Sequence, residues 1–163
     1  MDRETKEANS KTILIVEDDN VARRGLKRFL QVEGWKTLEA PNGVQGLRVF
    51  RSHLPEIILT DIVMPGFDGF FLTAVIKSIS PQSPVIIMTG LGDADFDGKA
   101  QHLGVSALLR KPFEPEELLD VLNDLNHLSG NSHYDKNNGK VFTALGTGTT
   151  AERRLDRRRQ SKV

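Results

Sequence analysis

Short apolar runs alternate with longer amphipathic segments along the first 128 residues. The runs contain many β-branched residues and no polar alternation, which is typical of strands buried on both faces of a parallel sheet. The predicted strands are Thr12–Val16, Trp35–Glu39, Glu56–Thr60, Pro84–Met88 and Ser106–Leu109, the second being weak. Between and after them the spacing predicts helices over 20–33 and 43–52, a helix that follows the loop Met64–Gly69 and continues to about Ser78, and helices over 93–103 and Glu114–Leu128. The first helix carries its apolar residues at about helical spacing, at Val21, Leu26, Phe29, Leu30 and Val32.

Five strands that alternate with five helices predict an α/β fold of the (βα)5 type. Right-handed crossovers then give an open, doubly wound parallel sheet with helices on both faces. In such sheets the functional crevice lies at the carboxyl ends of the strands. Five polar residues come at or just after predicted strand ends, namely Glu17, Asp18, Asp61, Thr89 and Lys111. We therefore expect these residues, which are distant in sequence, to meet at one edge of the sheet.

The chemistry of this set favours phosphoryl transfer. Glu17, Asp18 and Asp61 repel one another unless a cation lies between them, and a set of oxygen ligands with open positions suits Mg²⁺. Lys111 and the hydroxyl of Thr89 would add a positive charge and a hydrogen-bond donor for phosphoryl oxygens. A carboxylate can itself be the nucleophile, and Asp61 is the candidate because it stands alone at the end of the central strand.

Each of these residues also has a simpler explanation. Acids after a strand often cap helices or form turns, a threonine there is usually a turn residue, and Lys111 could be an ordinary solvated charge. The functional hypothesis depends on coincidence, because four strand ends each supply at least one member of a coherent site.

Four motifs in this order resemble the response-regulator receiver domain of two-component signalling. They are Ile13–Asp19 (ILIVEDD), Asp61–Gly69 (DIVMPGFDG), Met88–Gly90 (MTG) and Lys111–Phe113 (KPF). The resemblance covers about residues 11–128 and implies a flavodoxin-like five-stranded sheet of order 2-1-3-4-5. It also implies that a sensor histidine kinase or phosphotransfer protein phosphorylates Asp61, and that the domain catalyses its own phosphorylation and dephosphorylation without being an enzyme in the usual sense.

The resemblance assigns further roles residue by residue. Glu17, Asp18 and Asp61 would hold Mg²⁺ together with the backbone carbonyl of Val63, while Thr89 and Lys111 would contact the phosphoryl group. The Lys111-Pro112 peptide is expected to be cis. One position departs from the family pattern, because Leu108 stands three residues before the lysine, where many receivers carry Tyr or Phe. Output is therefore expected to use the fourth helix and its loops.

Composition and charge bear on the two ends of the chain. The chain has no cysteine, which excludes disulfides and thiol chemistry. Residues 1–10 are charged and are expected to be disordered. They lack the apolar core of a signal peptide, so the protein is predicted to be cytoplasmic, without membrane insertion. The composition of residues 129–163 predicts a flexible tail with no complete effector domain. From residue 130 onward this tail holds eight basic and three acidic residues. The tail is interpreted as a disordered appendage, an electrostatic contact or part of something longer.

The leading hypothesis is a stand-alone receiver that switches the binding of an unknown downstream protein, with a phosphorylation-dependent homodimer as one possible form. One alternative is a transcriptional regulator that contacts DNA through the basic tail, although nucleic acid is not the expected partner. Another is an aspartate-nucleophile phosphatase of the haloacid dehalogenase type. Such enzymes usually place a second acid two residues after the nucleophile, where this chain has Val63.

Overall fold

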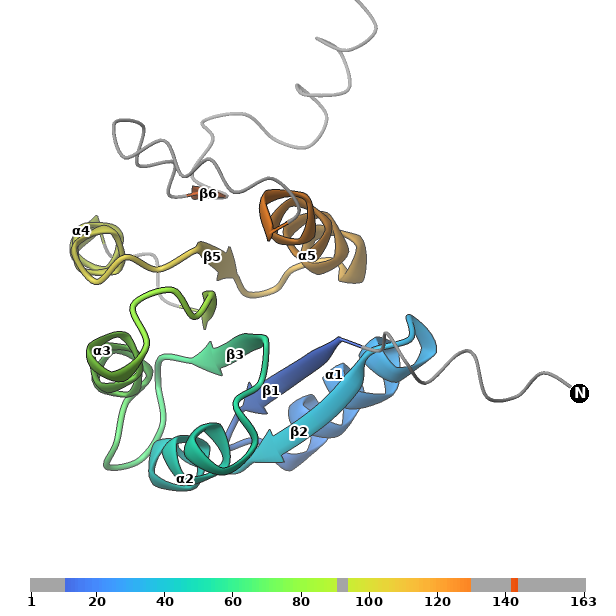
Figure 1. The fold of residues 1–163 in the computed structure, drawn as a ribbon, viewed down its shortest axis with the longest axis horizontal. Helices are drawn as coiled ribbons and strands as arrows, with labels where there is room; N and C mark the ends of the chain where they lie inside the picture. The colour runs from blue at the N-terminus through green and yellow to red at the C-terminus, as the bar shows by residue number, and fades with distance from the viewer. Residues whose placement is uncertain (1–10, 91–93, 130–141, 144–163) are drawn as a thin grey trace, which may run out of the picture.

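Five parallel strands form the centre of the structure, a computed structural model that describes residues 11–90, 94–129 and 142–143 (Figure 1). The strand order is β2-β1-β3-β4-β5, which confirms the predicted doubly wound sheet. Every residue of β3 and β4 is buried, and this explains their continuous apolar sequence. The strands are β1 (Thr12–Val16), β2 (Lys36–Ala40), β3 (Ile57–Asp61), β4 (Val85–Thr89) and β5 (Ala107–Arg110).

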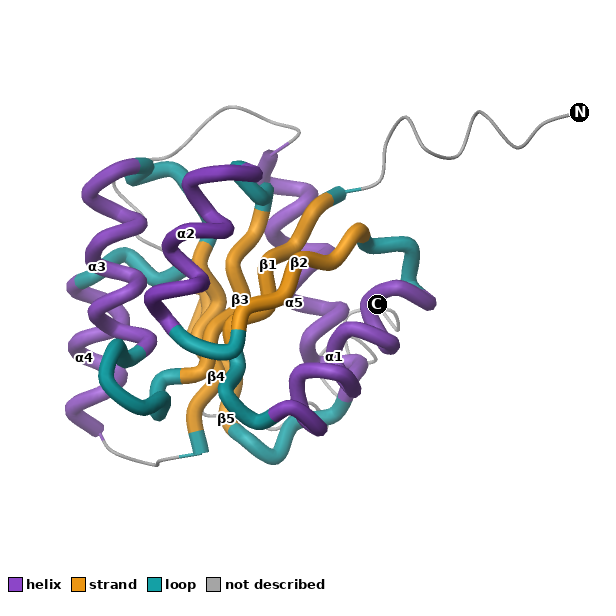
Figure 2. Tube along the Cα trace, turned by 90° about the horizontal axis from the view of Figure 1, so that it is seen from below, coloured by secondary structure: helices purple, strands orange, loops and turns teal. Residues whose placement is uncertain are grey.

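Helices cover both faces of the sheet, as the tube in Figure 2 shows. Three of them begin at a side-chain cap: Asp19, Asn42 and Asp68 accept hydrogen bonds from free N–H groups of the first helical turn. The helices are α1 (Asn20–Val32), α2 (Gly43–His53), α3 (Gly69–Ile79), α4 (Ala94–His102) and α5 (Pro115–Ser129).

Alternate residues of the strands divide the apolar interior into two layers. On one face, Leu14 and Ile58 pack with α2, α3 and α4. On the other face, Ile13 and Leu59 pack with α1 and α5. Within the described residues, no helix combines the length and the apolar character needed to cross a bilayer. The two layers hold the sheet between the helices, and Asp61 and Thr89 end β3 and β4 at its carboxyl edge.

One inference from the helical spacing was wrong in detail. The pattern grouped Val21 and Val32 with Leu30 in α1, but only Leu30 is buried, while Val21 and Val32 are 81% and 84% exposed. At about 100° per residue, the two valines lie on nearly the same side of the helix, opposite to Leu30. The face toward the sheet is formed by Leu26, Phe29 and Leu30.

A sixth strand that the sequence did not predict lies at the edge of the sheet. β6 (Phe142–Thr143) pairs in parallel with β5, with Ala107 opposite Phe142. It falls in the segment expected to be flexible. The rest of that segment, at 130–141 and 144–163, and the N-terminal residues 1–10 lie outside the described residues, so these predictions stay predictions.

Gly69 begins α3 where the helix passes very close to the end of β3. A Cβ added at Gly69 would come 2.1 Å from the backbone carbonyl oxygen of Asp61. The backbone N–H of Gly69 donates to the carbonyl oxygen of Ile62 at 3.0 Å. No side chain fits there without displacing backbone. Gly98 in α4 differs, because its Cβ would meet no atom within 4 Å.

We expect Gly69→Ala to lower the free energy of unfolding by about 1–3 kcal/mol, the usual cost of forcing extra atoms into a packed site. Gly98→Ala is the matched control and should raise it by about 0.5–1 kcal/mol through helix propensity alone. Urea unfolding of both variants measures the difference. Equal stability of the two variants would contradict the close approach at Gly69.

Candidate functional site

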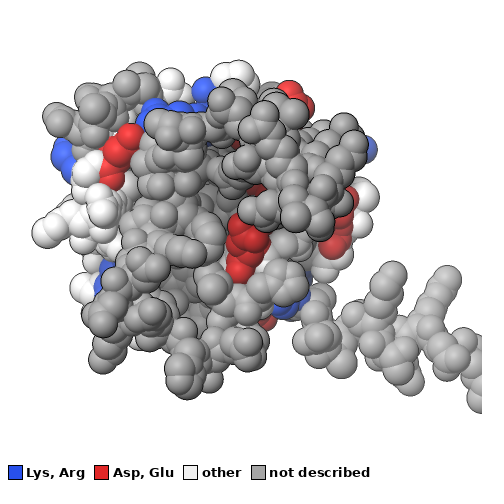
Figure 3. All heavy atoms as spheres, turned by 90° about the horizontal axis from the view of Figure 1, so that it is seen from above, with Lys and Arg blue, Asp and Glu red and all other residues white. Residues whose placement is uncertain are grey.

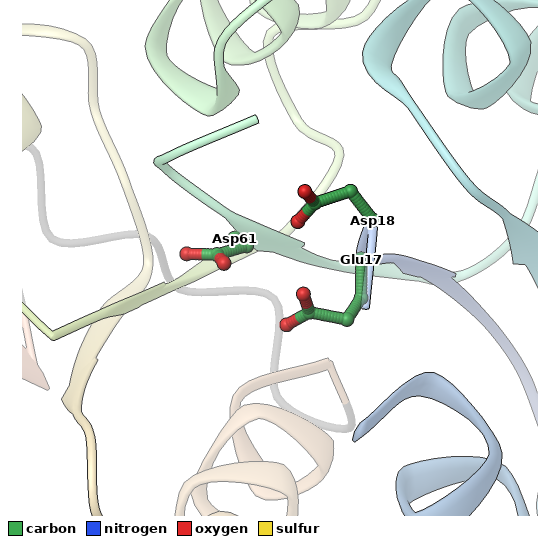
Figure 4. A group of neighbouring side chains, drawn as sticks. All are labelled: Glu17, Asp18 and Asp61. Carbon is green, nitrogen blue, oxygen red and sulfur yellow. The ribbon is translucent and has the colours of Figure 1, made fainter. Parts of the chain in front are cut away.

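The carboxyl edge of the sheet gathers the residues that the sequence singled out. Glu17 follows β1 directly, Asp61 ends β3, Thr89 ends β4 and Lys111 follows β5. Asp18 comes next to Glu17, and Figure 4 shows the carboxylates of Glu17, Asp18 and Asp61 directed into one shared space. The parallel sheet thus brings together the side chains of Glu17, Asp18, Asp61 and Lys111, and Thr89 ends the strand next to Asp61 at the same edge.

The three acids form a cluster that could hold a metal ion. One carboxylate oxygen from each lies within 4.8 Å of the others. Glu17 and Asp61 are 1% and 8% exposed, whereas Asp18 is open to solvent. Like charges at this separation repel strongly unless a cation shares them. A set of carboxylate oxygens alone fits a hard divalent cation such as Mg²⁺, which binds oxygen and keeps several waters.

Lys111 is the resident cation of the cluster. Its Nζ lies 2.8 Å from Oε2 of Glu17 and 3.0 Å from Oδ2 of Asp61, so that one ammonium group bridges two carboxylates. Burial alone would lower the pKa of Lys111, but the hydrogen bonds to Glu17 and Asp61 outweigh it and raise that pKa. Lys111 therefore stays charged at neutral pH.

For Glu17, in contrast, the effect of burial on the pKa outweighs that of the hydrogen bonds. Its burial raises the pKa of the carboxyl above the ordinary value, although hydrogen bonds from Lys111 and from the backbone N–H of Asp19 act to lower it. The Oε1 atom accepts the Asp19 N–H at 3.1 Å while Oε2 accepts Lys111. Both oxygens are thus held, but the charge on Glu17 carries a desolvation cost that an added cation would relieve.

The loop after β3 is built around Asp61. The N–H of Val63 donates to Oδ1 of Asp61 at 3.4 Å, and α3 begins at the Asp68 cap and the close approach of Gly69. The side chain of Val63 is 57% exposed. Val63 and Lys111 thus contact different oxygens of the Asp61 carboxylate.

Thr89 and Lys111 are joined through the backbone. The N–H of Lys111 donates to the carbonyl oxygen of Thr89 at 2.7 Å, and the Lys111-Pro112 peptide is cis, as the resemblance implied. The hydroxyl-bearing side chain of Thr89 is buried, 1% exposed. Leu108, three residues before Lys111, is also buried and packs in the layer of α2, α3 and α4.

Two arginine contacts near the site were missed by sequence reasoning. Arg110, which pairs with Thr89 across the strands, donates from its Nη2 to both carboxylate oxygens of Asp97 of α4, at 2.9 and 3.0 Å. Arg23 of α1 reaches back to the carbonyl oxygen of Glu17. Arg23 lies one helical turn after the Asp19 cap, and this spacing is the sequence signal that could have indicated its contact with the backbone of Glu17.

Comparisons with known proteins agree on one family. A family model described as the response regulator receiver domain matches residues 13–123. Sporulation initiation phosphotransferase F of Bacillus subtilis is 34% identical over 68% of this chain and 89% of its own length. Chemotaxis protein CheY of Halobacterium salinarum is 30% identical over 71% of this chain and 97% of its own. A receiver domain protein from Clostridium thermocellum superposes with a TM-score of 0.68 at 31% identity, covering 73% of this chain and 97% of that one.

The raised pKa of Glu17 gives a testable pH dependence of stability in metal-free buffer. A carboxyl whose pKa is higher in the folded protein favours folding below its ordinary pKa and loses that contribution as the pH rises through the folded value. Glu17→Gln removes the titration. We expect its unfolding free energy relative to wild type to increase between about pH 4 and about pH 7.

Urea unfolding with EDTA present, over a pH series, measures this difference. Glu33→Gln, at an exposed position at the end of α1, is the matched control and should show a nearly constant difference from wild type. A constant difference for Glu17→Gln as well would contradict the desolvated state of that carboxyl.

Proposed function

This chain belongs to the response regulator receiver domain family, and on that premise we propose that Asp61 accepts a phosphoryl group from a histidine kinase or a phosphotransfer protein. The observation that carries the proposal is the contact of Asp61 with Lys111 at 3.0 Å beside two further acids. Glu17, Asp18, Asp61 and the carbonyl of Val63 would hold Mg²⁺. Such an ion, when bound, would neutralise charge on the phosphoryl oxygens.

The chemistry requires little more of the protein than positioning and charge. An oxygen of Asp61 bonds to phosphorus, the phosphorus–nitrogen bond of the phosphohistidine breaks, and the imidazole leaves with its electron pair. The ammonium of Lys111, which pairs with Oδ2 of Asp61 before transfer, would then pair with an oxygen of the phosphoryl group. The hydroxyl of Thr89 would donate to a second oxygen. Two oxygens of the product are thereby bound by groups already at the edge of the sheet.

Within the described residues, the other candidate functions lack a matching feature; the basic tail at 130–141 and 144–163 lies outside them. An aspartate-nucleophile phosphatase would need a second acid at Val63, whose apolar side chain is exposed. A DNA contact needs a broad basic surface for phosphate groups. On the face shown in Figure 3, the acidic and basic side chains of the described residues are interspersed. The DNA-binding regulator NtrC of Escherichia coli is 38% identical, but the match spans only 24% of that protein.

An apolar groove next to the acids supports a protein partner as the phosphoryl donor. It has a volume of about 470 Å³ and runs between α1 and the start of α5. Glu17 and Lys111 form part of its lining, so the groove is continuous with the site. A histidine-bearing helix that lies in the groove would bring its phosphoryl group to Asp61. The apolar lining is provided mainly by Ala22, Leu26, Phe29, Pro112, Phe113 and Leu118.

Output is proposed to pass through α4. The ion pair of Arg110 with Asp97 links α4 to β5. Arg110 precedes Lys111 in the sequence and lies opposite Thr89 in the sheet. A change at the phosphoryl group that moves Thr89 or Lys111 would therefore act on the attachment of α4. This route does not depend on the missing aromatic residue at Leu108. A downstream protein or a second copy of the chain would bind the altered face.

Acetyl phosphate with Mg²⁺ tests the acceptor directly. We expect intact mass to show the addition of one phosphoryl group to the wild-type protein and none to Asp61→Asn, because the amide cannot act as the nucleophile. Omission of Mg²⁺, with EDTA present, should abolish most of the labelling. Glu33→Gln, which removes an exposed acid at the end of α1, outside the cluster, is the control and should be labelled like wild type. Labelling of Asp61→Asn to the wild-type extent would refute the assignment.

The groove gives a second test at Gly25 of α1. A Cβ at Gly25 would meet no atom within 4 Å, so a larger side chain fits there but occupies the groove. The donor for this test is whichever phosphorylated histidine kinase labels the wild-type chain fastest. We expect Gly25→Leu to slow phosphoryl transfer from this kinase at least about tenfold, which corresponds to the loss of about 1.4 kcal/mol of binding energy. Labelling by acetyl phosphate should be unchanged. Equal slowing with both donors would show that the variant damages the site and not docking.

A further inference from the structure

The guanidinium of Arg23 reaches back from α1 to the acidic cluster. Its Nη1 donates to the backbone carbonyl oxygen of Glu17 at 2.6 Å, and its side chain is only 14% exposed. That carbonyl belongs to the peptide that joins Glu17 to Asp18. Arg23 therefore holds the peptide between two of the three acids, without contacting either carboxylate.

The guanidinium is itself fixed on its other sides. Its Nη2 donates to Oδ1 of Asn20 at 3.0 Å, and its Nε lies 3.7 Å from Oε1 of Glu39 on β2. Glu39 also pairs with Lys27 of α1. A planar fork held at three points restrains the group that it contacts more closely than a flexible ammonium could. The peptide after Glu17 is thus tied both to α1 and to the neighbouring strand.

Asp18 is the member of the cluster that most needs this restraint. It is exposed, and among the described residues its carboxylate makes no hydrogen bond or ion pair. Glu17 and Asp61, in contrast, are held by Lys111. The position of the Asp18 carboxylate therefore depends on its backbone. Mg²⁺ demands nearly octahedral ligand geometry, so an error in the position of this ligand reduces affinity.

We propose that Arg23 is a positioning residue that sets the Mg²⁺ affinity of the site by fixing the Glu17-Asp18 peptide; this rests on the metal-dependent function proposed above. The charge of Arg23 acts in the opposite direction, since a cation near the acids repels Mg²⁺. Position and charge can therefore be separated by mutation. Arg23→Lys keeps the charge and loses the fork, whereas Arg23→Gln loses the charge as well.

Isothermal titration calorimetry with Mg²⁺ alone on the full chain makes the test. We expect the dissociation constant to rise about fivefold or more in both Arg23→Lys and Arg23→Gln, the order of magnitude of one charge-assisted hydrogen bond. Lys27→Gln, which also breaks a contact to Glu39 but touches neither Glu17 nor Asp18, is the matched control and should bind like wild type. Thermal unfolding of the metal-free variants shows whether the folded state is retained.

An unchanged affinity in Arg23→Lys together with a tighter one in Arg23→Gln would overturn the proposal, because charge alone gives that result. An equal loss in Lys27→Gln would also overturn it, since the effect would then come from the packing of α1. If the Arg23 variants do not fold, Asn20→Ala decides, because it frees one side of the guanidinium: a weaker affinity supports the proposal and an unchanged one refutes it. Absence of Mg²⁺ binding to the wild-type chain would remove the metal site itself, a failure of the proposed function.

Discussion

The site depends on the pairing of one ammonium group with two buried carboxylates. Lys111 bridges Glu17 and Asp61 at hydrogen-bond distance, and without it two like charges would be confined at the end of the sheet with little solvent. The same residues would stabilise a phosphoryl group, because a cation already positioned there needs little reorganisation. Asp18, on the open side of the cluster, is left to complete an ion site. Burial raises the pKa of Glu17, so its charged form carries a desolvation cost even beside Lys111.

The parallel sheet is what allows so few residues to produce this arrangement. The strands end at the same edge of the sheet, so one or two residues at the ends of four strands suffice. The helices contribute through their first turns: Asp19 and Asp68 cap α1 and α3 and thereby fix the loops next to Glu17 and Asp61. The absence of a side chain on Gly69 lets α3 start against the backbone of Asp61. Packing and chemistry thus constrain the same short loops.

Periodicity and the geometry of parallel strand ends predicted the doubly wound sheet and the polar residues at its carboxyl edge, whereas the strand order followed from the resemblance to receiver domains. It did not predict the contact of Arg23 with Glu17 or the ion pair of Arg110 with Asp97. Both depend on which way a long side chain turns and on how closely a helix packs, and apolar spacing carries neither. The exposure of Val32 has the same origin, because spacing identifies a helix more reliably than the face that meets the sheet. The two residues of β6 are too few to give a periodic signal.

A crystal structure of the protein with Mg²⁺ and beryllofluoride, a stable mimic of the phosphoryl group, would test the central pairing most directly. The account predicts a beryllium adduct on an oxygen of Asp61, the ammonium of Lys111 hydrogen-bonded to a fluorine atom, and the ion bound by Asp18. An adduct on another residue, or a Lys111 side chain that turns away from the adduct into solvent, would contradict it.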